Sequence, residues 1–150
     1  MNPYETPVHR AAVGVLITDL EGKVLLVSNP YRANLVQVGG MVEAGETLAE
    51  AAEREALEEI GLKLTVTRLL AVHHKRGEDA ADTMVYVFDT DPIDSKTPLT
   101  LQADEISGVF WLEPEEAIAR HTQRGQARLA AALKARATNT TVYLDADRTL

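Results

Sequence analysis

Cysteine is absent from this chain of 150 residues, and the aromatic residues Phe, Trp and Tyr together make up only 5% of it. The lack of cysteine excludes disulfides, thiolate zinc sites and cysteine nucleophiles, and it agrees with a reducing compartment. The longest apolar run, residues 11–17, is far shorter than the ~20 residues of a membrane span. Residues 1–10 carry two prolines and charges where a signal peptide needs an apolar stretch. We therefore expect a cytoplasmic protein that does not bind membranes.

The chain is acidic, and its acidic residues are concentrated in one segment. Asp and Glu number 23 against 15 Lys and Arg, which gives a net charge of −8. Seven of the acids lie between Glu43 and Glu59, where Arg54 is the only base. An acidic chain disfavours broad contact with a nucleic acid polymer. The local excess of carboxylates raises the question of which cation neutralises it.

Length and composition indicate one folded domain. The chain is 45% hydrophobic and 25% charged, which is typical of a soluble globular protein. At this length it can bury roughly 70% of the surface that the unfolded chain exposes. No linker, internal repeat or low-complexity tract interrupts the sequence. We therefore expect a single domain over residues 1–150.

The distribution of apolar residues predicts a mixture of strands and helices. The predicted strands are 11–18, 23–28, 35–38, 64–73, 83–89, 108–112 and 141–144, and the predicted helices are 47–60, 115–120 and 126–137. Residues 19–22 carry a hairpin signal between the first two strands, and the glycine-rich segment 39–46 is predicted to be irregular. Strands mixed with helices around a central helix favour an α+β domain with α/β/α layers.

The helix over residues 47–60 has recognisable signals at both ends. Thr47 and Glu50 match a capping box, in which each side chain satisfies a backbone donor of the first turn. Gly61 stands where a left-handed cap ends a helix. The residues expected to pack on a sheet are Ala49, Ala56, Leu57 and Ile60.

Three carboxylates share another sector of this helix. Glu58 and Glu59 each lie within about 60° of Glu55 around the helix axis. Like charges at this spacing repel one another, whereas Mg²⁺ and Mn²⁺ prefer oxygen ligands and keep positions open for substrate phosphates. The pattern therefore predicts a divalent cation site, with an acidic, solvated helix face as the alternative.

The residues around these carboxylates complete a longer motif. It reads Gly40-x5-Glu46-x7-Arg54-Glu55-Ala56-x-Glu58-Glu59-x-Gly61-Leu62. This segment resembles the Nudix box of the MutT-like Nudix hydrolase family, G-x5-E-x7-R-E-U-x-E-E-x-G-U, where U is aliphatic. Every specified position matches, and Ala56 is the least typical because a bulkier side chain is usual there.

The resemblance implies a fold and an activity. The fold is an α/β/α sandwich with a mixed sheet and a catalytic loop-helix-loop. The activity is hydrolysis, dependent on Mg²⁺ or Mn²⁺, of a nucleoside diphosphate linked to another group. In this reading Glu55, Glu58 and Glu59 are the metal ligands. One of them, or Glu105 from a later loop, is the general base.

The resemblance also assigns structural and substrate-binding residues. Glu46 and Arg54 correspond to a salt bridge that fixes the loop against the helix, and Gly61 closes the box. Gly39 and Gly40 would allow unusual backbone geometry and close approach to the diphosphate. Apart from the resemblance, the basic residues Arg32, Lys75 and Arg76 lie in loops or strand ends and could clamp phosphate, and Tyr31 could stack on a base. A plain surface position is the alternative for each of them.

Other polar residues are weaker candidates. Adjacent positions in a strand point to opposite faces, so His73 and His74 do not share a metal easily. Asp104 precedes a predicted strand, as Glu105 does, and a solvated loop is the alternative for both. The C-terminal helix is expected to pack within the domain or to form the surface of a homodimer.

Two other classes of enzyme are excluded by the sequence. A P-loop would need Lys where Glu46 stands, and none of the serines lies in a G-x-S-x-G nucleophile elbow.

The segment before the paired glycines departs from the family pattern. Many Nudix proteins carry Trp and Leu-Pro there, whereas this chain has Leu35, Gln37 and Val38. The substrate, expected to be a small nucleotide-type molecule, is therefore not specified further. The competing function is a catalytically silent Nudix domain that senses a nucleotide-like ligand.

Overall fold

The computed structural model describes residues 4–150, so the first three residues of the expected domain lie outside it. Its elements, in chain order, are β1 (Arg10–Leu16), β2 (Val24–Ser28), β3 (Gly39–Met41), α1 (Leu48–Ile60), β4 (Val66–Lys75), β5 (Thr83–Thr90), β6 (Gly108–Leu112), α2 (Pro114–Arg120), α3 (Gln123–Thr138), β7 (Val142–Asp145) and β8 (Arg148–Thr149). None of the helices in this described part is long and apolar enough to cross a bilayer.

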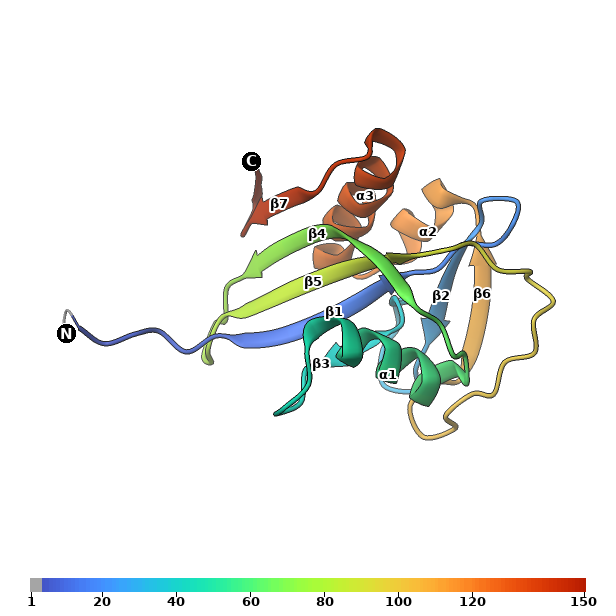
Figure 1. The fold of residues 1–150 in the computed structure, drawn as a ribbon, viewed down its shortest axis with the longest axis horizontal. Helices are drawn as coiled ribbons and strands as arrows, with labels where there is room; N and C mark the ends of the chain where they lie inside the picture. The colour runs from blue at the N-terminus through green and yellow to red at the C-terminus, as the bar shows by residue number, and fades with distance from the viewer. Residues whose placement is uncertain (1–3) are drawn as a thin grey trace.

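Six strands form one mixed sheet in the order β3-β1-β5-β4-β7-β8. Strand β1 pairs antiparallel with β3 and parallel with β5, and β4 pairs antiparallel with β5. Strands β2 and β6 form a separate antiparallel pair. Helices α1 and α3 lie on opposite sides of the larger sheet (Figure 1). The predicted α/β/α layers and mixed sheet are confirmed.

The alternating faces of β1 divide the core into two halves. Val13 and Val15 pack in the half that contains α1, whereas Leu16 packs in the half that contains α3. On α3, the buried residues Leu129 and Ala132 contact this second half. The C-terminal helix is thus packed within the domain, and a homodimer stays a prediction.

Helix α1 begins and ends as its sequence predicts. The Thr47 hydroxyl accepts from the Glu50 backbone N–H at 3.2 Å, and the Glu50 carboxylate accepts from the Thr47 N–H at 2.7 Å. Gly61 ends the helix with φ of 68°. The assignment of Leu57 to the packing face is wrong, because its side chain is 53% exposed. The buried side of the helix consists of Ala51, Ala52, Ala56, Glu59 and Ile60.

The strands around the first two turns differ from the prediction. Residues 19–22 do form a turn, with Asp19 N–H donating to Lys23 O at 2.9 Å, but β1 and β2 then join different sheets. The expected strand 35–38 makes only isolated bridges, and the segment predicted to be irregular contains β3. Strand β8 was not predicted. These strands have only two or three residues, which is too short for a hydrophobic period to be read.

Arg136 fixes α3 to the ends of β1 and β5. Its guanidinium forms an ion pair with the buried Asp89 and donates to the Thr18 hydroxyl at 2.9 Å. Asp89, the last residue of the predicted strand 83–89, is therefore a structural residue.

The variant Arg136→Gln is expected to lower the free energy of unfolding by about 3 kcal/mol, because it leaves Asp89 buried without a cation. The matched control is Arg148→Gln, which removes an ion pair to Asp145 on the surface and should cost less than about 1 kcal/mol. Urea unfolding measures both values. Equal losses in the two variants would contradict the assigned role of Arg136.

Candidate active site

The paired glycines of β3 give space to their neighbours. A Cβ on Gly39 would lie 2.1 Å from the Val13 carbonyl oxygen, so the close approach of β3 to β1 requires glycine here. A Cβ on Gly40 would lie 2.3 Å from Glu55 Oε1. Neither glycine has positive φ. At Gly39 the expected geometry, which a residue with a Cβ could not adopt, is confirmed as a close approach of two strands rather than as a left-handed conformation. The space at the two glycines admits β1 and the Glu55 carboxyl, and close approach to a diphosphate stays a prediction.

Glu59 lies against the edge of the sheet. It is only 5% exposed, and its Oε1 accepts a hydrogen bond from Gly39 N–H at 3.0 Å. Burial, followed by the negative charges of Glu55 and Glu105, raises the pKa of Glu59 to about 8 even though the Gly39 bond opposes this. Within residues 4–150, Glu59 has no ion-pair partner closer than 4.0 Å. The group therefore has a strong electrostatic preference for a nearby cation.

Glu46 and Arg54 join the glycine-rich loop to α1. Arg54 Nε and Nη2 donate to the two oxygens of Glu46 at 2.9 and 2.7 Å, a bidentate geometry. Arg54 Nη2 also donates to Met41 O at 3.0 Å, and Glu46 accepts from Glu43 N–H at 2.7 Å. The Arg54 hydrogen bond, followed by that from Glu43, lowers the pKa of Glu46 to about 2.

The same arginine also touches two of the three clustered carboxylates. Arg54 Nη1 lies 3.0 Å from Glu55 Oε1 and 3.2 Å from Glu58 Oε2. Glu58 has the most open side chain of the three, at 49% exposure. Arg54 thus supplies positive charge to Glu55 and Glu58 but none directly to Glu59.

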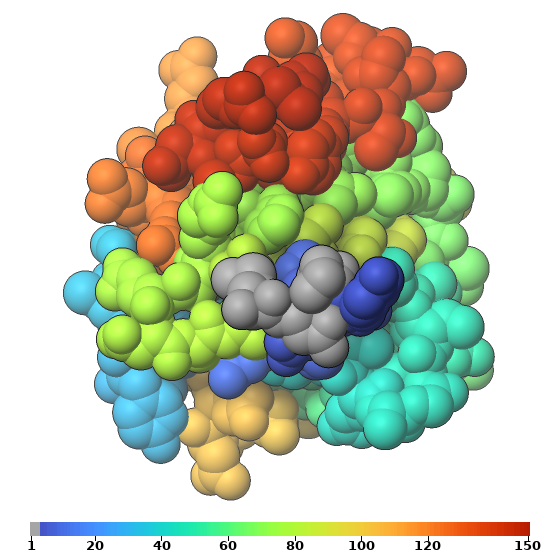
Figure 2. Space-filling view, turned by 90° about the vertical axis from the view of Figure 1, so that its left-hand side faces the viewer, coloured from blue at the N-terminus to red at the C-terminus, as the bar shows by residue number. Residues whose placement is uncertain are grey.

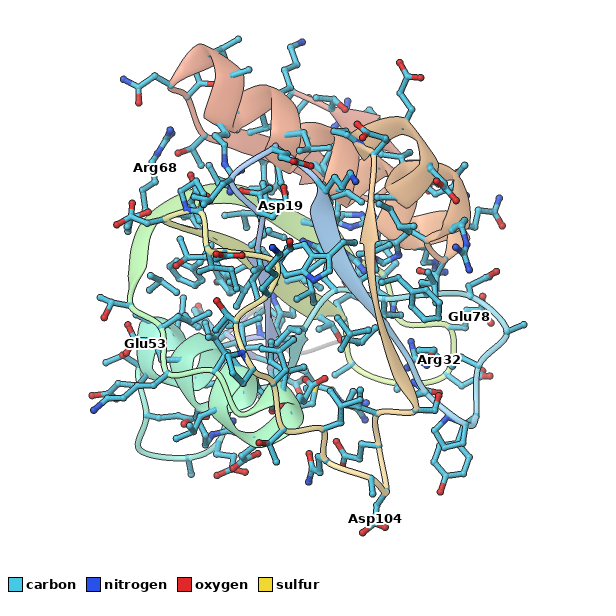
Figure 3. All side chains as sticks on the ribbon, turned by 90° about the vertical axis from the view of Figure 1, so that its right-hand side faces the viewer. Asp19, Arg32, Glu53, Arg68, Glu78 and Asp104 are labelled. Atoms are coloured by element: carbon cyan, nitrogen blue, oxygen red, sulfur yellow. The ribbon has the colours of Figure 1, made fainter. Side chains whose placement is uncertain are left out.

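A later loop brings a fourth carboxylate to the site. Gln102 N–H donates to the Glu59 carbonyl at 2.9 Å, and Thr100 N–H donates to the Ile60 carbonyl at 2.9 Å. These bonds hold the loop against the end of α1, and Glu105 lines the cavity beside Glu59. Asp104 points away from the body of the molecule (Figure 3). Of the two neighbouring acids, only Glu105 is placed to act with α1.

A cavity of about 650 Å³ lies on the α3 face of the sheet. Its floor is formed by small and apolar residues of β1 and β5, namely Ala12, Gly14, Val85 and Val87. Glu59 and Glu105 line one part of it. Of the residues expected to bind substrate, those that line it are Tyr31, Arg32, Gly39, Gly40 and Lys75. Arg76 instead lines a second cavity, of about 500 Å³, together with Arg124.

Several residues that line the cavity were not singled out from the sequence. His121 and Thr122 come from the junction of α2 and α3, Arg128 comes from α3, and Arg10 comes from the start of β1. None belongs to a motif, and only the packing of α3 over the sheet brings them together. Of these residues, Arg128 could have been noticed in the sequence, because it interrupts an otherwise apolar face of the predicted C-terminal helix.

The two adjacent histidines do point to different surroundings, as predicted. His73 is buried, donates from Nε2 to Ala146 O at 2.9 Å and accepts from Arg128 Nη1 at 3.2 Å. His74 contacts Asp82 Oδ2 at 2.7 Å. With His9 these two residues form a group whose potential ligand atoms lie within 4.8 Å of one another. Asp82 also accepts from Gly77 N–H at 2.9 Å, so it closes the loop between β4 and β5.

The carboxylates of α1 suit a hard divalent cation. Their donor atoms are all oxygens, which Mg²⁺ and Mn²⁺ prefer. The buried Glu59 has no compensating cation within the part of the chain described, and Glu58 is open to solvent for a shared ligand. The residues that could hold such an ion are Glu55, Glu58 and Glu59, with Glu105 beside them.

The fold and this site together define an α/β/α domain with a carboxylate-bearing loop-helix-loop. The family model of the NUDIX domain matches residues 8–133. The Nudix hydrolase YfcD of Shigella flexneri is 34% identical over 118 residues, which are 75% of this chain and 63% of that protein. The CTP pyrophosphohydrolase of Escherichia coli K12 is 30% identical over 106 residues, 68% of this chain and 75% of that protein.

Solved structures show the same fold. The MutT protein from Methanosarcina mazei superposes with a TM-score of 0.74 at 17% identity, covering 88% of this chain and 98% of that one. The chain belongs to the Nudix family, whose members generally depend on divalent metals. It spans less than two thirds of the length of the YfcD relative.

Stability should fall in acid because of the Glu46 salt bridge. The pKa of Glu46 is about 2 in the folded protein and 4.5 in the reference state. Its contribution is therefore complete above pH 4.5 and is lost as the pH falls towards 2. We expect the difference in free energy of unfolding between the unsubstituted protein and Glu46→Gln to shrink between pH 5.5 and 3. Urea unfolding at each pH measures this difference.

The control for that experiment is Glu115→Gln, which removes an exposed carboxylate of α2. It corrects for the general effect of deleting one negative charge. A Glu46→Gln difference that stays constant over the whole interval, after this correction, would show that the salt bridge does not lower the pKa of Glu46.

Proposed function

We propose that this chain is a hydrolase that uses Mg²⁺ or Mn²⁺ to cleave the diphosphate of a nucleoside diphosphate linked to another group. The observation that carries the proposal is the convergence of Glu55, Glu59 and Glu105, of which Glu59 and Glu105 line a cavity. Glu59 is buried and has no cation partner among the described residues. An acidic, solvated helix face would not bury its carboxylate against the sheet edge.

The acidic residues of the site have two roles in the proposed hydrolysis, metal binding and general-base catalysis. Glu55, Glu58 and Glu59 would hold the cation, and the Gly39 N–H orients Glu59 for this role. Bound there, the cation would neutralise the diphosphate, polarise phosphorus and lower the pKa of the attacking water. Glu105 is the general base in this proposal, because it comes from a separate loop and leaves the α1 carboxylates to the metal.

Arg54 acts through position in this scheme. Its bidentate pair with Glu46 leaves Nη1 fixed between Glu55 and Glu58, so that both carboxylates point to the same region. Water attack on one phosphorus then breaks one P–O–P bond and releases two phosphate-bearing products, which are a nucleoside monophosphate and pyrophosphate when the substrate is a nucleoside triphosphate. The substrate is a small molecule, and the relative named as a CTP pyrophosphohydrolase makes nucleoside triphosphates the first compounds to test.

Product release across a panel of nucleotides tests the proposal. The panel contains CTP, the other nucleoside triphosphates, ADP-ribose and a nucleotide sugar, each with Mg²⁺, with Mn²⁺ and with EDTA. We expect metal-dependent release of phosphate-bearing products from at least one compound. Binding of a panel compound without hydrolysis under any of the metal conditions would instead support the silent sensor domain.

Glu58→Gln should reduce turnover about 100-fold or more while the protein stays folded, because a ligand that stabilises the transition-state charge is weakened. The matched control is Glu53→Gln on the same helix. Glu53 accepts from Val66 N–H at 3.1 Å, and an amide oxygen can replace that acceptor. Rates are measured on the best substrate of the panel, with thermal unfolding as the test of folding. Normal turnover in Glu58→Gln would refute the metal-binding role of this helix face.

A further inference from the structure

The part of the cavity away from Glu59 is lined by cations. Arg32 follows β2, Lys75 ends β4, and Arg128 lies on the second turn of α3. Figure 2 shows their segments side by side on one face: the light-blue loop after β2, the yellow-green end of β4 and the orange start of α3. Together with His121, these three residues are named here the cationic end of the cavity.

None of these cations is neutralised by a carboxylate. Across residues 4–150, the ion pairs within 4.0 Å do not include Arg32, Lys75 or Arg128. The lack of carboxylate partners for these three cations is unexpected in a chain with a net charge of −8, in which acidic residues outnumber basic ones. Arg128 is half-buried, and its hydrogen bond goes to the neutral ring of His73.

The cations also repel one another. Burial, followed by the charges of Arg128, Arg124 and Arg32, lowers the pKa of Lys75. Burial and then Arg124 lower that of Arg128 as well. Like charges gathered in a partly desolvated cavity destabilise the folded protein unless an anion joins them.

His121 is an independent sign of a missing partner. The residue is 4% exposed and belongs to the lining of the cavity, and its Nε2 is buried without a hydrogen-bond partner among the described residues. Burial, followed by the charges of Arg128 and Arg32, lowers its pKa to about 4, so the ring is neutral. A buried polar atom that makes no hydrogen bond destabilises the folded protein.

The Thr122 hydroxyl contacts the other nitrogen of the His121 ring. Thr122 Oγ1 accepts from Gly125 N–H at 3.2 Å and lies 3.2 Å from His121 Nδ1. The hydroxyl oxygen has two lone pairs, so it can accept from Nδ1–H or donate to Nδ1. In either tautomer Nε2 has no hydrogen-bond partner among the described residues. Gly125 is needed for this arrangement, because a Cβ there would lie 2.0 Å from the imidazole.

The cationic end is separated from the carboxylates by the floor of the sheet. Gly39, which binds Glu59, pairs with Gly14 of β1, whereas Lys75 pairs with Thr83 and through it with Arg10. Gly14 and Arg10 are four residues apart on β1, which is about 13 Å along the strand. Strands β3 and β4 are three strand spacings apart, which is about 14 Å across the sheet. One diphosphate held by the carboxylates would therefore not reach the whole cationic end.

We propose that the cationic end binds a phosphate group of the substrate other than the diphosphate that is cleaved. The inference rests on the proposed function for the identity of the cleaved bond, and it adds that the preferred substrate carries a further phosphate remote from that bond. A phosphate has oxygens enough to accept from Arg32, Lys75 and Arg128 together. The apolar floor would lie under the part of the substrate that joins the two anionic groups.

Inorganic phosphate in EDTA buffer is the probe, because without metal the carboxylates repel phosphate. Isothermal titration at matched ionic strength is expected to show binding to the unsubstituted protein. Lys75→Gln and Arg128→Gln should each weaken it about tenfold or more. The control Lys134→Gln removes an exposed cation on α3 outside the cavity and should change the affinity less than twofold. Lys75 is the last residue of β4, so we expect Lys75→Gln to fold. This variant therefore tests the proposal even if Arg128→Gln does not fold.

Three results would overturn the proposal: no phosphate binding by the unsubstituted protein, equal binding by Lys75→Gln and Lys134→Gln, or acetate binding as tightly as phosphate. The last would assign the cationic end to a carboxylate. Metal-dependent hydrolysis of the nucleotide panel, measured on the same variants, separates this outcome from failure of the proposed function. Hydrolysis without phosphate binding would refute only the proposed phosphate site at the cationic end. Phosphate binding without hydrolysis would refute only the proposed hydrolase function.

Discussion

Electrostatic repulsion among carboxylates is the constraint around which this end of the molecule is arranged. Three glutamates within five residues of α1 would repel one another on an isolated helix. Arg54 offsets part of this repulsion by contacting Glu55 and Glu58, and Glu46 in turn fixes Arg54. Glu59 has no cation partner among the described residues, and burial, followed by the charges of Glu55 and Glu105, raises its pKa. A divalent cation is therefore the partner that the arrangement favours.

The surrounding elements serve the same arrangement. The two glycines of β3 leave space for the β1 backbone and for the Glu55 carboxyl, and Gly39 supplies the hydrogen bond that orients Glu59. The loop that carries Glu105 is held by the backbone carbonyls of Glu59 and Ile60 at the end of α1. Packing and chemistry therefore depend on the same few residues.

The sequence predicted those features that depend on local order. The capping box, Gly61 and the glutamate spacing are set within one helix and one loop, so α1 and its carboxylates follow from them. The cationic end could not be predicted in this way. Its members come from the loop after β2, the end of β4 and α3, and only the pairing order of the sheet and the packing of α3 bring them together. The prediction that Leu57 packs on the sheet is wrong for a related reason. Helical periodicity shows which side chains share a face, but it does not show how far the neighbouring sheet extends along that face.

The most direct test of the account is a crystal structure with Mn²⁺ and a non-hydrolysable nucleotide, in which anomalous scattering locates the ion. The account predicts a peak within about 2–2.5 Å of carboxylate oxygens of Glu58 and Glu59, in contact with the diphosphate. A peak at His9, His74 and Asp82 instead, with the α1 carboxylates turned away from any ion, would contradict it.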